Sequence, residues 1–91
     1  MALKHWNIKV TGKVQGVWYR ANTLETAQQL GLKGFVMNKE DGSVFIEAEG
    51  EEAKLEALLA WCKQGPENAI VSEVTVEDRD LTGFEGFEIR H

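Results

Sequence analysis

The spacing of apolar residues changes repeatedly along this chain, and the order of those changes restricts the fold more than any other sequence feature. Over residues 6–11 every second residue is apolar, which is the period of a strand with one buried face. Over residues 21–30 the apolar residues recur every third position, as on one face of a helix. They are Ala21, Leu24, Ala27 and Leu30. Gly31, followed by Leu32, is expected to end this helix in a left-handed conformation.

Two further strands and a tight turn follow the first helix. Residues 34–38 and 43–49 have strand patterns, and the sequence Lys-Glu-Asp-Gly at 39–42 predicts a hairpin between them, with Gly42 at positive φ. Alternation in the third strand separates two sets of residues: Val44, Ile46 and Ala48 on one face, and Phe45, Glu47 and Glu49 on the other. The first set is expected to face the core.

The strongest helix pattern begins after Gly50 and ends at Gly65 and Pro66. Its apolar residues fall at positions i, i+3, i+4 and i+7, namely Leu55, Leu58, Leu59 and Cys62. Residues 70–76 alternate again and predict a fourth strand. Phe87 and Ile89 predict a short closing strand.

The elements follow the order β-α-β-β-α-β with a strand-like tail. This order predicts a fold of the α+β class, a ferredoxin-like α/β sandwich with an antiparallel sheet, two helices on one face and a short C-terminal strand. A length of 91 residues suits one domain, so we expect a single domain over residues 1–91. Many unrelated functions share this topology, so the activity must be inferred from the site residues.

The charge of the sequence limits the classes of partner. Fifteen acidic and ten Lys or Arg residues give a formal net charge of −5, so the overall field repels polyanions. Nucleic acid and anionic membrane are therefore not expected as partners, and any bound anion must be held locally. No apolar run approaches the roughly 18 residues of a membrane span, and the N-terminus carries no leader pattern. We expect a cytoplasmic, monomeric protein.

Three residues with reactive side chains are assigned no catalytic role. Cys62 is the single cysteine and falls on the apolar face of the second helix, which favours core packing over nucleophilic catalysis. His5 and His91 lie near the two ends without metal-ligand spacing, and both are expected on the surface. We expect neither a metal nor another cofactor.

The turn V-Q-G-V-W-Y-R, residues 14–20, has unusual chemistry for a strand-to-helix connection. Gly16 can take positive φ, which lets successive N–H groups converge on an anion. Arg20 lies at the helix start, where the helix dipole favours an anion and disfavours a cation. Its guanidinium fork matches a phosphate group. From the residues alone, a phosphate site and a plain turn with a surface-paired arginine are equally good interpretations.

Asn38 is the second unusual residue, because asparagine is disfavoured inside strands. As an isolated residue it is more simply interpreted as the start of the turn at 39–42. As part of a site, its side-chain amide could orient a water molecule through one acceptor and two donors without ever changing charge.

Two segments resemble the signatures of a known family. G-K-V-Q-G-V-W-Y-R at 12–20 resembles the first acylphosphatase signature, G-x-V-Q-G-V-x-[FY]-R. Residues 34–50 resemble the second signature, and four residues stand in register with it: Asn38, Gly42, Val44 and Gly50. The similarity continues through residues 30–34, 61–66 and 86–90, so it covers essentially the whole chain.

This resemblance implies an enzyme that hydrolyses small acyl phosphates to a carboxylate and inorganic phosphate without a metal. Matched residue by residue, Arg20 would bind phosphate and Asn38 would position the attacking water. The phosphate-binding loop would contribute the backbone amides of Gln15, Gly16, Val17, Trp18, Tyr19 and Arg20. Either Trp18 or Tyr19 is expected to pack under this loop, and the sequence leaves open which one.

Two other classes of function are compatible with the element order. The first is a non-catalytic ferredoxin-like module that binds a phosphorylated ligand or a protein partner, and the presence of both Arg20 and Asn38 argues against it. The second is an RNA-recognition module. Glu47 and Glu49 on the expected open face would repel a phosphate backbone, and the sequence contains no RNP1 pattern.

Overall fold

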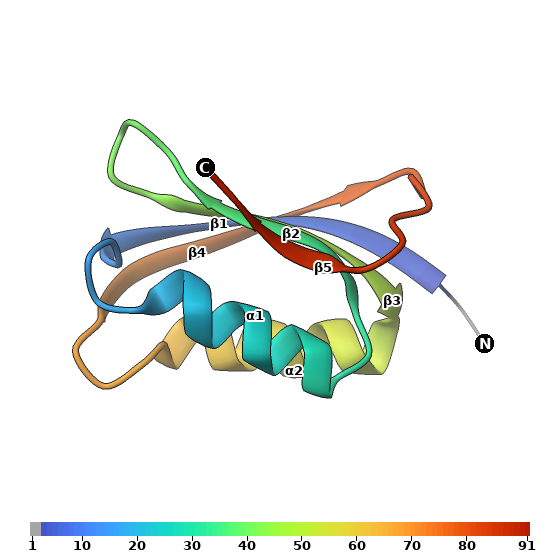
Figure 1. The fold of residues 1–91 in the computed structure, drawn as a ribbon, viewed down its shortest axis with the longest axis horizontal. Helices are drawn as coiled ribbons and strands as arrows, with labels where there is room; N and C mark the ends of the chain where they lie inside the picture. The colour runs from blue at the N-terminus through green and yellow to red at the C-terminus, as the bar shows by residue number, and fades with distance from the viewer. Residues whose placement is uncertain (1–2) are drawn as a thin grey trace.

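The computed structural model describes residues 3–91, so residues 1–2 of the predicted domain lie outside the described residues. Its elements are β1 (Leu3–Lys13), α1 (Tyr19–Gln29), β2 (Lys33–Asn38), β3 (Val44–Glu51), α2 (Glu52–Gln64), β4 (Ile70–Arg79) and β5 (Phe87–Arg90). Both helices lie on one face of a five-stranded sheet (Figure 1). This arrangement confirms the predicted ferredoxin-like α+β fold.

The strand order across the sheet is β4-β1-β3-β2-β5. The pairs β1–β4, β1–β3 and β2–β3 are antiparallel, as predicted, whereas β5 pairs with β2 in parallel and makes the sheet mixed. The chain must pass from β4 at one edge to β5 at the other, and residues 80–86 make this crossing. We call residues 80–86 the strap. Its path brings the C-terminal strand beside β2, with Ile89 opposite Val36 (Figure 1).

The core lies between the sheet and the helices. The predicted inner set of β3, Val44, Ile46 and Ala48, is fully buried. From α2 the buried residues are Leu55, Leu58 and Cys62, which confirms the predicted apolar face of that helix. None of the helices within residues 3–91 has the length and apolar character needed to cross a membrane.

The predicted buried face of α1 is partly wrong. The helix begins at Tyr19, and its buried residues are Tyr19, Thr23 and Ala27, while Ala21 is exposed. Polar side chains can occupy this face because their hydroxyls are satisfied inside the core. Tyr19 donates to the carbonyl oxygen of Cys62 at 2.7 Å, and Thr23 donates to the carbonyl oxygen of Tyr19 at 2.8 Å.

The prediction that His5 lies on the surface is wrong. His5 is 3% exposed, because the strap covers it on the face of the sheet opposite the helices. Its Nδ1 donates to the Asp80 carbonyl oxygen at 2.7 Å, and its Nε2 lies 2.9 Å from Glu47. Glu49, beside it on β3, accepts hydrogen bonds from the backbone N–H groups of residues 82–84. A polar cluster therefore fastens the strap to the sheet.

Candidate active site

The loop between β1 and α1 has two residues in left-handed conformations. Gly16 has φ 73°, as predicted, and Trp18, the N-cap of α1, has φ 66° and ψ 20°. No backbone N–H group from residue 15 to residue 20 donates to a protein acceptor within residues 3–91. The first turn of α1 also contains no acidic residue and no side-chain cap. Free amides and an uncompensated helix dipole can together bind an anion here.

The loop is fixed to the β2–β3 hairpin by Gln15. Its Nε2 donates to the carbonyl oxygens of Lys39 at 2.8 Å and Ser43 at 2.9 Å. Val17 is buried in the core. The side chains of Gln15 and Val17 therefore hold the loop in shape, and at these two positions the backbone alone is free to meet a ligand.

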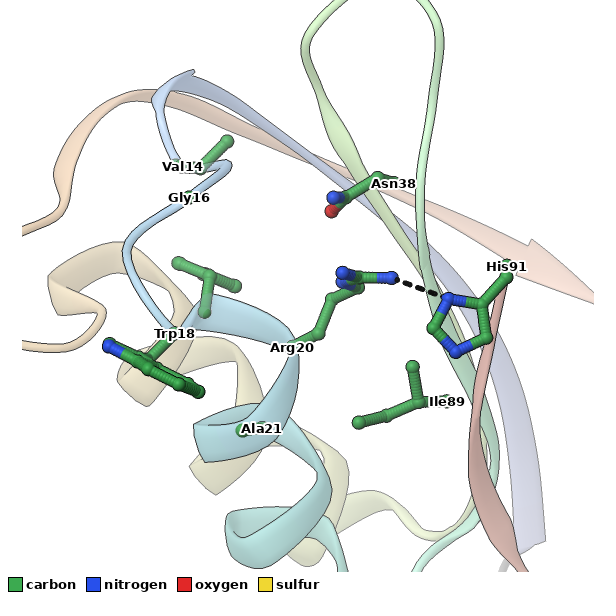
Figure 2. A pocket seen from close by; sticks show the side chains of 9 residues that line it. Val14, Gly16, Trp18, Arg20, Ala21, Asn38, Ile89 and His91 are labelled. Carbon is green, nitrogen blue, oxygen red and sulfur yellow. Dashed lines mark hydrogen bonds between the residues drawn. The ribbon is translucent and has the colours of Figure 1, made fainter.

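A cleft of ≈ 430 Å³ opens beside this loop (Figure 2). Its lining residues are Val14, Gly16, Trp18, Tyr19, Arg20, Ala21, Asn38, Ile89 and His91. The volume falls within the usual range of small-molecule sites, about 300–1,000 Å³. The fold thus brings Arg20 from α1 and Asn38 from the end of β2 into one cavity.

Arg20 makes no ion pair with a carboxylate within residues 3–91. This differs from the plain-turn interpretation, in which a surface carboxylate would neutralise the arginine. Instead its Nη1 lies 3.3 Å from Nδ1 of His91 (dashed line in Figure 2). A guanidinium has only donors, so His91 Nδ1 accepts in this contact. The positive charge of Arg20 therefore remains available to an anion in the cleft.

Asn38 has a buried Oδ1 with no hydrogen-bond partner. Figure 2 shows its amide directed toward Arg20 across the cleft. The adjacent turn is closed without it, because Lys39 N–H donates to the Ser43 carbonyl oxygen and the side chain of Asp41 accepts from Ser43. A buried acceptor without a partner costs about 1–3 kcal/mol, and a donor in the cleft, such as water, would remove that cost.

The structure assigns different positions to Trp18 and Tyr19, which the sequence left open. Tyr19 is buried under the loop, with its ring 5.1 Å from that of Trp61. Burial, aided by contact with Cys62, raises the pKa of Tyr19 far above its ordinary value, so its hydroxyl remains a donor. Trp18 is 77% exposed at the rim of the cleft.

Four lining residues were not among the predicted site residues: Val14, Ala21, Ile89 and His91. His91 is exposed, as predicted, but the contact with Arg20 was not expected. Ile89 and His91 reach the cleft because β5 pairs with β2. The sequence signal for them was the alternation at 87–89, which predicts a strand but not its neighbour.

The fold and the cleft define a ferredoxin-like α+β protein with a cationic site at the start of its first helix. Within that class, residues 6–89 match the sequence profile of the acylphosphatase family. The chain belongs to the acylphosphatase family. It is thus a hydrolase of acyl phosphates, which are acid anhydrides.

Individual relatives agree with this assignment over nearly the full length. The acylphosphatase of Marinobacter nauticus is 48% identical, and the alignment covers 100% of both chains. The structure of an acylphosphatase from Bacillus subtilis has a TM-score of 0.94 at 35% identity and covers 99% of this chain and 100% of that one. For an acylphosphatase from Coxiella burnetii the TM-score is 0.94 at 34% identity, with 97% and 93% covered.

Proposed function

We propose that the protein hydrolyses small acyl phosphates by direct attack of water on phosphorus, without a metal ion, and releases a carboxylate and inorganic phosphate. One observation carries this proposal. A single cleft contains a guanidinium without a carboxylate partner, a run of free amides and an amide oxygen without a hydrogen-bond partner. These groups match, in turn, the charge of the phosphate, its oxygens and the attacking water.

Arg20 and the backbone amides of residues 15–20 bind the phosphate group in this mechanism. The guanidinium offers two parallel donors, and the amides at the helix N-terminus complete the set. Phosphoryl transfer depends mainly on positioning and on stabilisation of charge on the equatorial oxygens. Donors fixed in advance are effective here because they need no reorganisation during the reaction.

Asn38 positions the water. Its Oδ1 accepts one O–H of the water, which leaves a water lone pair directed at phosphorus. A new P–O bond forms as the bond to the acyl oxygen breaks, the carboxylate leaves with the electron pair, and a phosphate oxygen takes the water's proton. Because a carboxylic acid has a pKa of roughly 4, its anion leaves without protonation. No general acid is needed.

No protein side chain acts as the nucleophile in this mechanism. Burial raises the pKa of the Cys62 thiol to about 12, and Cys62 lies in the core rather than in the cleft. Within residues 3–91 no three His, Cys, Asp or Glu side chains are grouped so that they could hold a metal ion. The burial of Cys62 supports direct attack by water rather than by a side chain.

Substitution of the two polar residues tests the mechanism. With acetyl phosphate as substrate, Asn38→Ala is expected to lower kcat by about 10²- to 10³-fold with little change in stability, because one preorganised contact is lost. Arg20→Ala is expected to abolish turnover and the binding of inorganic phosphate. Asn68→Ala and Arg79→Ala, at exposed positions outside the cleft, serve as matched controls. An Asn38→Ala enzyme with parental kcat would remove the water-positioning role.

The leaving-group argument has its own test. We expect rapid hydrolysis of acetyl phosphate and negligible hydrolysis of a phosphate monoester, because the leaving group of a monoester is an alkoxide, which leaves poorly without protonation. We expect no effect of a chelator. Equal rates on the two substrates, or loss of activity with the chelator, would contradict the proposal. A protein that binds phosphate yet hydrolyses no acyl phosphate would match the non-catalytic alternative.

We also propose that residues 1–91 form one domain and that it acts as a cytoplasmic monomer.

A further inference from the structure

Trp18 combines three properties that are costly in a loop residue. It is bulky and aromatic, it adopts a left-handed conformation at φ 66°, and its side chain is 77% exposed. Glycine would adopt this conformation without strain. The side chain does not cap α1. Neither burial nor capping explains a tryptophan at this position, and a strained residue beside a site points to a role in that site.

The position of Trp18 in the cleft suggests that role. In Figure 2 the Arg20 side chain lies between Asn38 on one side and Trp18 and Ala21 on the other. In phosphoryl transfer the attacking and leaving oxygens are roughly in line through phosphorus. With water on Asn38 and phosphate on Arg20, the leaving acyl group therefore points toward Trp18.

The cleft has room and suitable chemistry for such a group. At ≈ 430 Å³ it offers space beyond a phosphate, and on the side away from Asn38 it is lined by the indole of Trp18 together with Ala21. An exposed indole presents a flat apolar face. Flat, aromatic groups stack on such a face in offset or edge-to-face arrangements.

We propose that Trp18 binds the acyl group and makes the enzyme prefer acyl phosphates whose acyl group is aromatic. This inference rests on the proposed function, because the phosphate on Arg20 and the water on Asn38 set the direction of the acyl group. Trp18 determines specificity by contacting the leaving acyl group. Asn38, on the other side of the cleft, positions the water that attacks phosphorus.

Kinetic selectivity tests the proposal. The measured quantity is kcat/KM for benzoyl phosphate divided by kcat/KM for acetyl phosphate. Trp18→Gly is expected to lower this ratio by roughly 2- to 13-fold, which corresponds to the loss of one aromatic contact. Trp18→Phe should keep most of it. Ile70→Ala removes another exposed apolar side chain, outside the cleft, and should leave the ratio unchanged. A parental ratio in Trp18→Gly would overturn the inference.

A binding measurement separates this inference from the proposed function. Calorimetry with inorganic phosphate reports on the phosphate site, and calorimetry with the non-hydrolysable phenacyl phosphonate reports on that site plus the aromatic contact. The parent should bind the phosphonate more tightly than phosphate, and Trp18→Gly should lose that preference. If Arg20→Ala binds phosphate as the parent does, the proposed function fails. If phosphate binding depends on Arg20 but the phosphonate preference survives in Trp18→Gly, this inference alone fails.

Discussion

Replacing Glu49 with glutamine is expected to release the strap from the sheet. Glu49 is 8% exposed, and its carboxylate accepts hydrogen bonds from the N–H groups of Thr82, of Gly83 at 2.9 Å and of Phe84 at 3.0 Å. Glutamine keeps the shape but has one acceptor oxygen, and its NH₂ group cannot accept. The strap leads directly into β5, so this contact also supports the strand that completes the cleft.

The size of the effect follows from these contacts. In the best orientation, the glutamine oxygen keeps the bonds from Gly83 and Phe84, and its NH₂ group faces the N–H of Thr82. A hydrogen bond to a charged acceptor contributes about 1.5–3 kcal/mol, and a buried donor left unpaired costs about 1–3 kcal/mol. His5 also loses a carboxylate 3.5 Å away. We expect a loss of about 3 kcal/mol in the free energy of unfolding, or roughly 12–24 °C in Tm.

The effect should depend on pH in a defined direction. Burial by itself raises the pKa of Glu49, but the N–H groups of Thr82, Phe84 and Gly83 outweigh it and hold the pKa below its ordinary value. Because this pKa is lower in the folded than in the unfolded protein, ionised Glu49 stabilises the fold. The stabilisation is fully present above the unfolded pKa of about 4.3 and is lost as the pH falls through the folded pKa. Glutamine does not titrate. The difference between parent and variant should therefore be present at pH 7 and shrink below about pH 4.

Urea unfolding monitored by fluorescence measures the loss, and amide hydrogen exchange locates it. The amides of residues 82–84 should exchange faster in Glu49→Gln. Glu51→Gln, an exposed substitution two residues along β3, should stay within about 0.5 kcal/mol of the parent. Equal stability of Glu49→Gln and parent at pH 7 would refute the reasoning, as would a difference that does not diminish in acid.

Two further predictions concern the core and the sheet. Gly34→Ala should destabilise the protein by about 3 kcal/mol or more in urea unfolding, because at φ 143° a Cβ would lie 1.8 Å from the Glu47 carbonyl oxygen. Gly31→Ala, also at positive φ but with open space around it, should cost only about 1–2 kcal/mol, and equal losses would exclude the steric explanation. Cys62 should resist an aromatic disulfide reagent at pH 8 until the protein unfolds, because burial raises its pKa to about 12. Labelling of the folded protein at the rate of a free thiol would contradict this assignment.

Much of the fold follows from local pattern. The alternation in β3 predicted its buried face, and the spacing in α2 predicted Leu55, Leu58 and Cys62 in the core. Gly31 and Gly42 have the positive φ expected from their places after a helix and in a hairpin. Such features can be predicted because they depend on backbone geometry over a few residues.

The site was predicted in part. Family resemblance, rather than periodicity, raised Arg20 and Asn38 above the simpler interpretations of a turn arginine and a turn asparagine, and the structure places both in one cleft. The left-handed conformation of Trp18 had no signal in the sequence, because glycine is the residue expected there.

The sequence by itself determined the order of the elements, the faces of β3 and α2, and two of the segments that line the cleft. Tertiary structure decided the burial of His5, the burial of Tyr19 instead of Trp18, and the place of β5 beside β2. His5 shows the physical reason, because its partner Asp80 is 75 residues away along the chain. Periodicity reflects residues within one or two turns of each other. The burial of His5 and Tyr19 and the place of β5 depend instead on which distant segments pack against one another and exclude water.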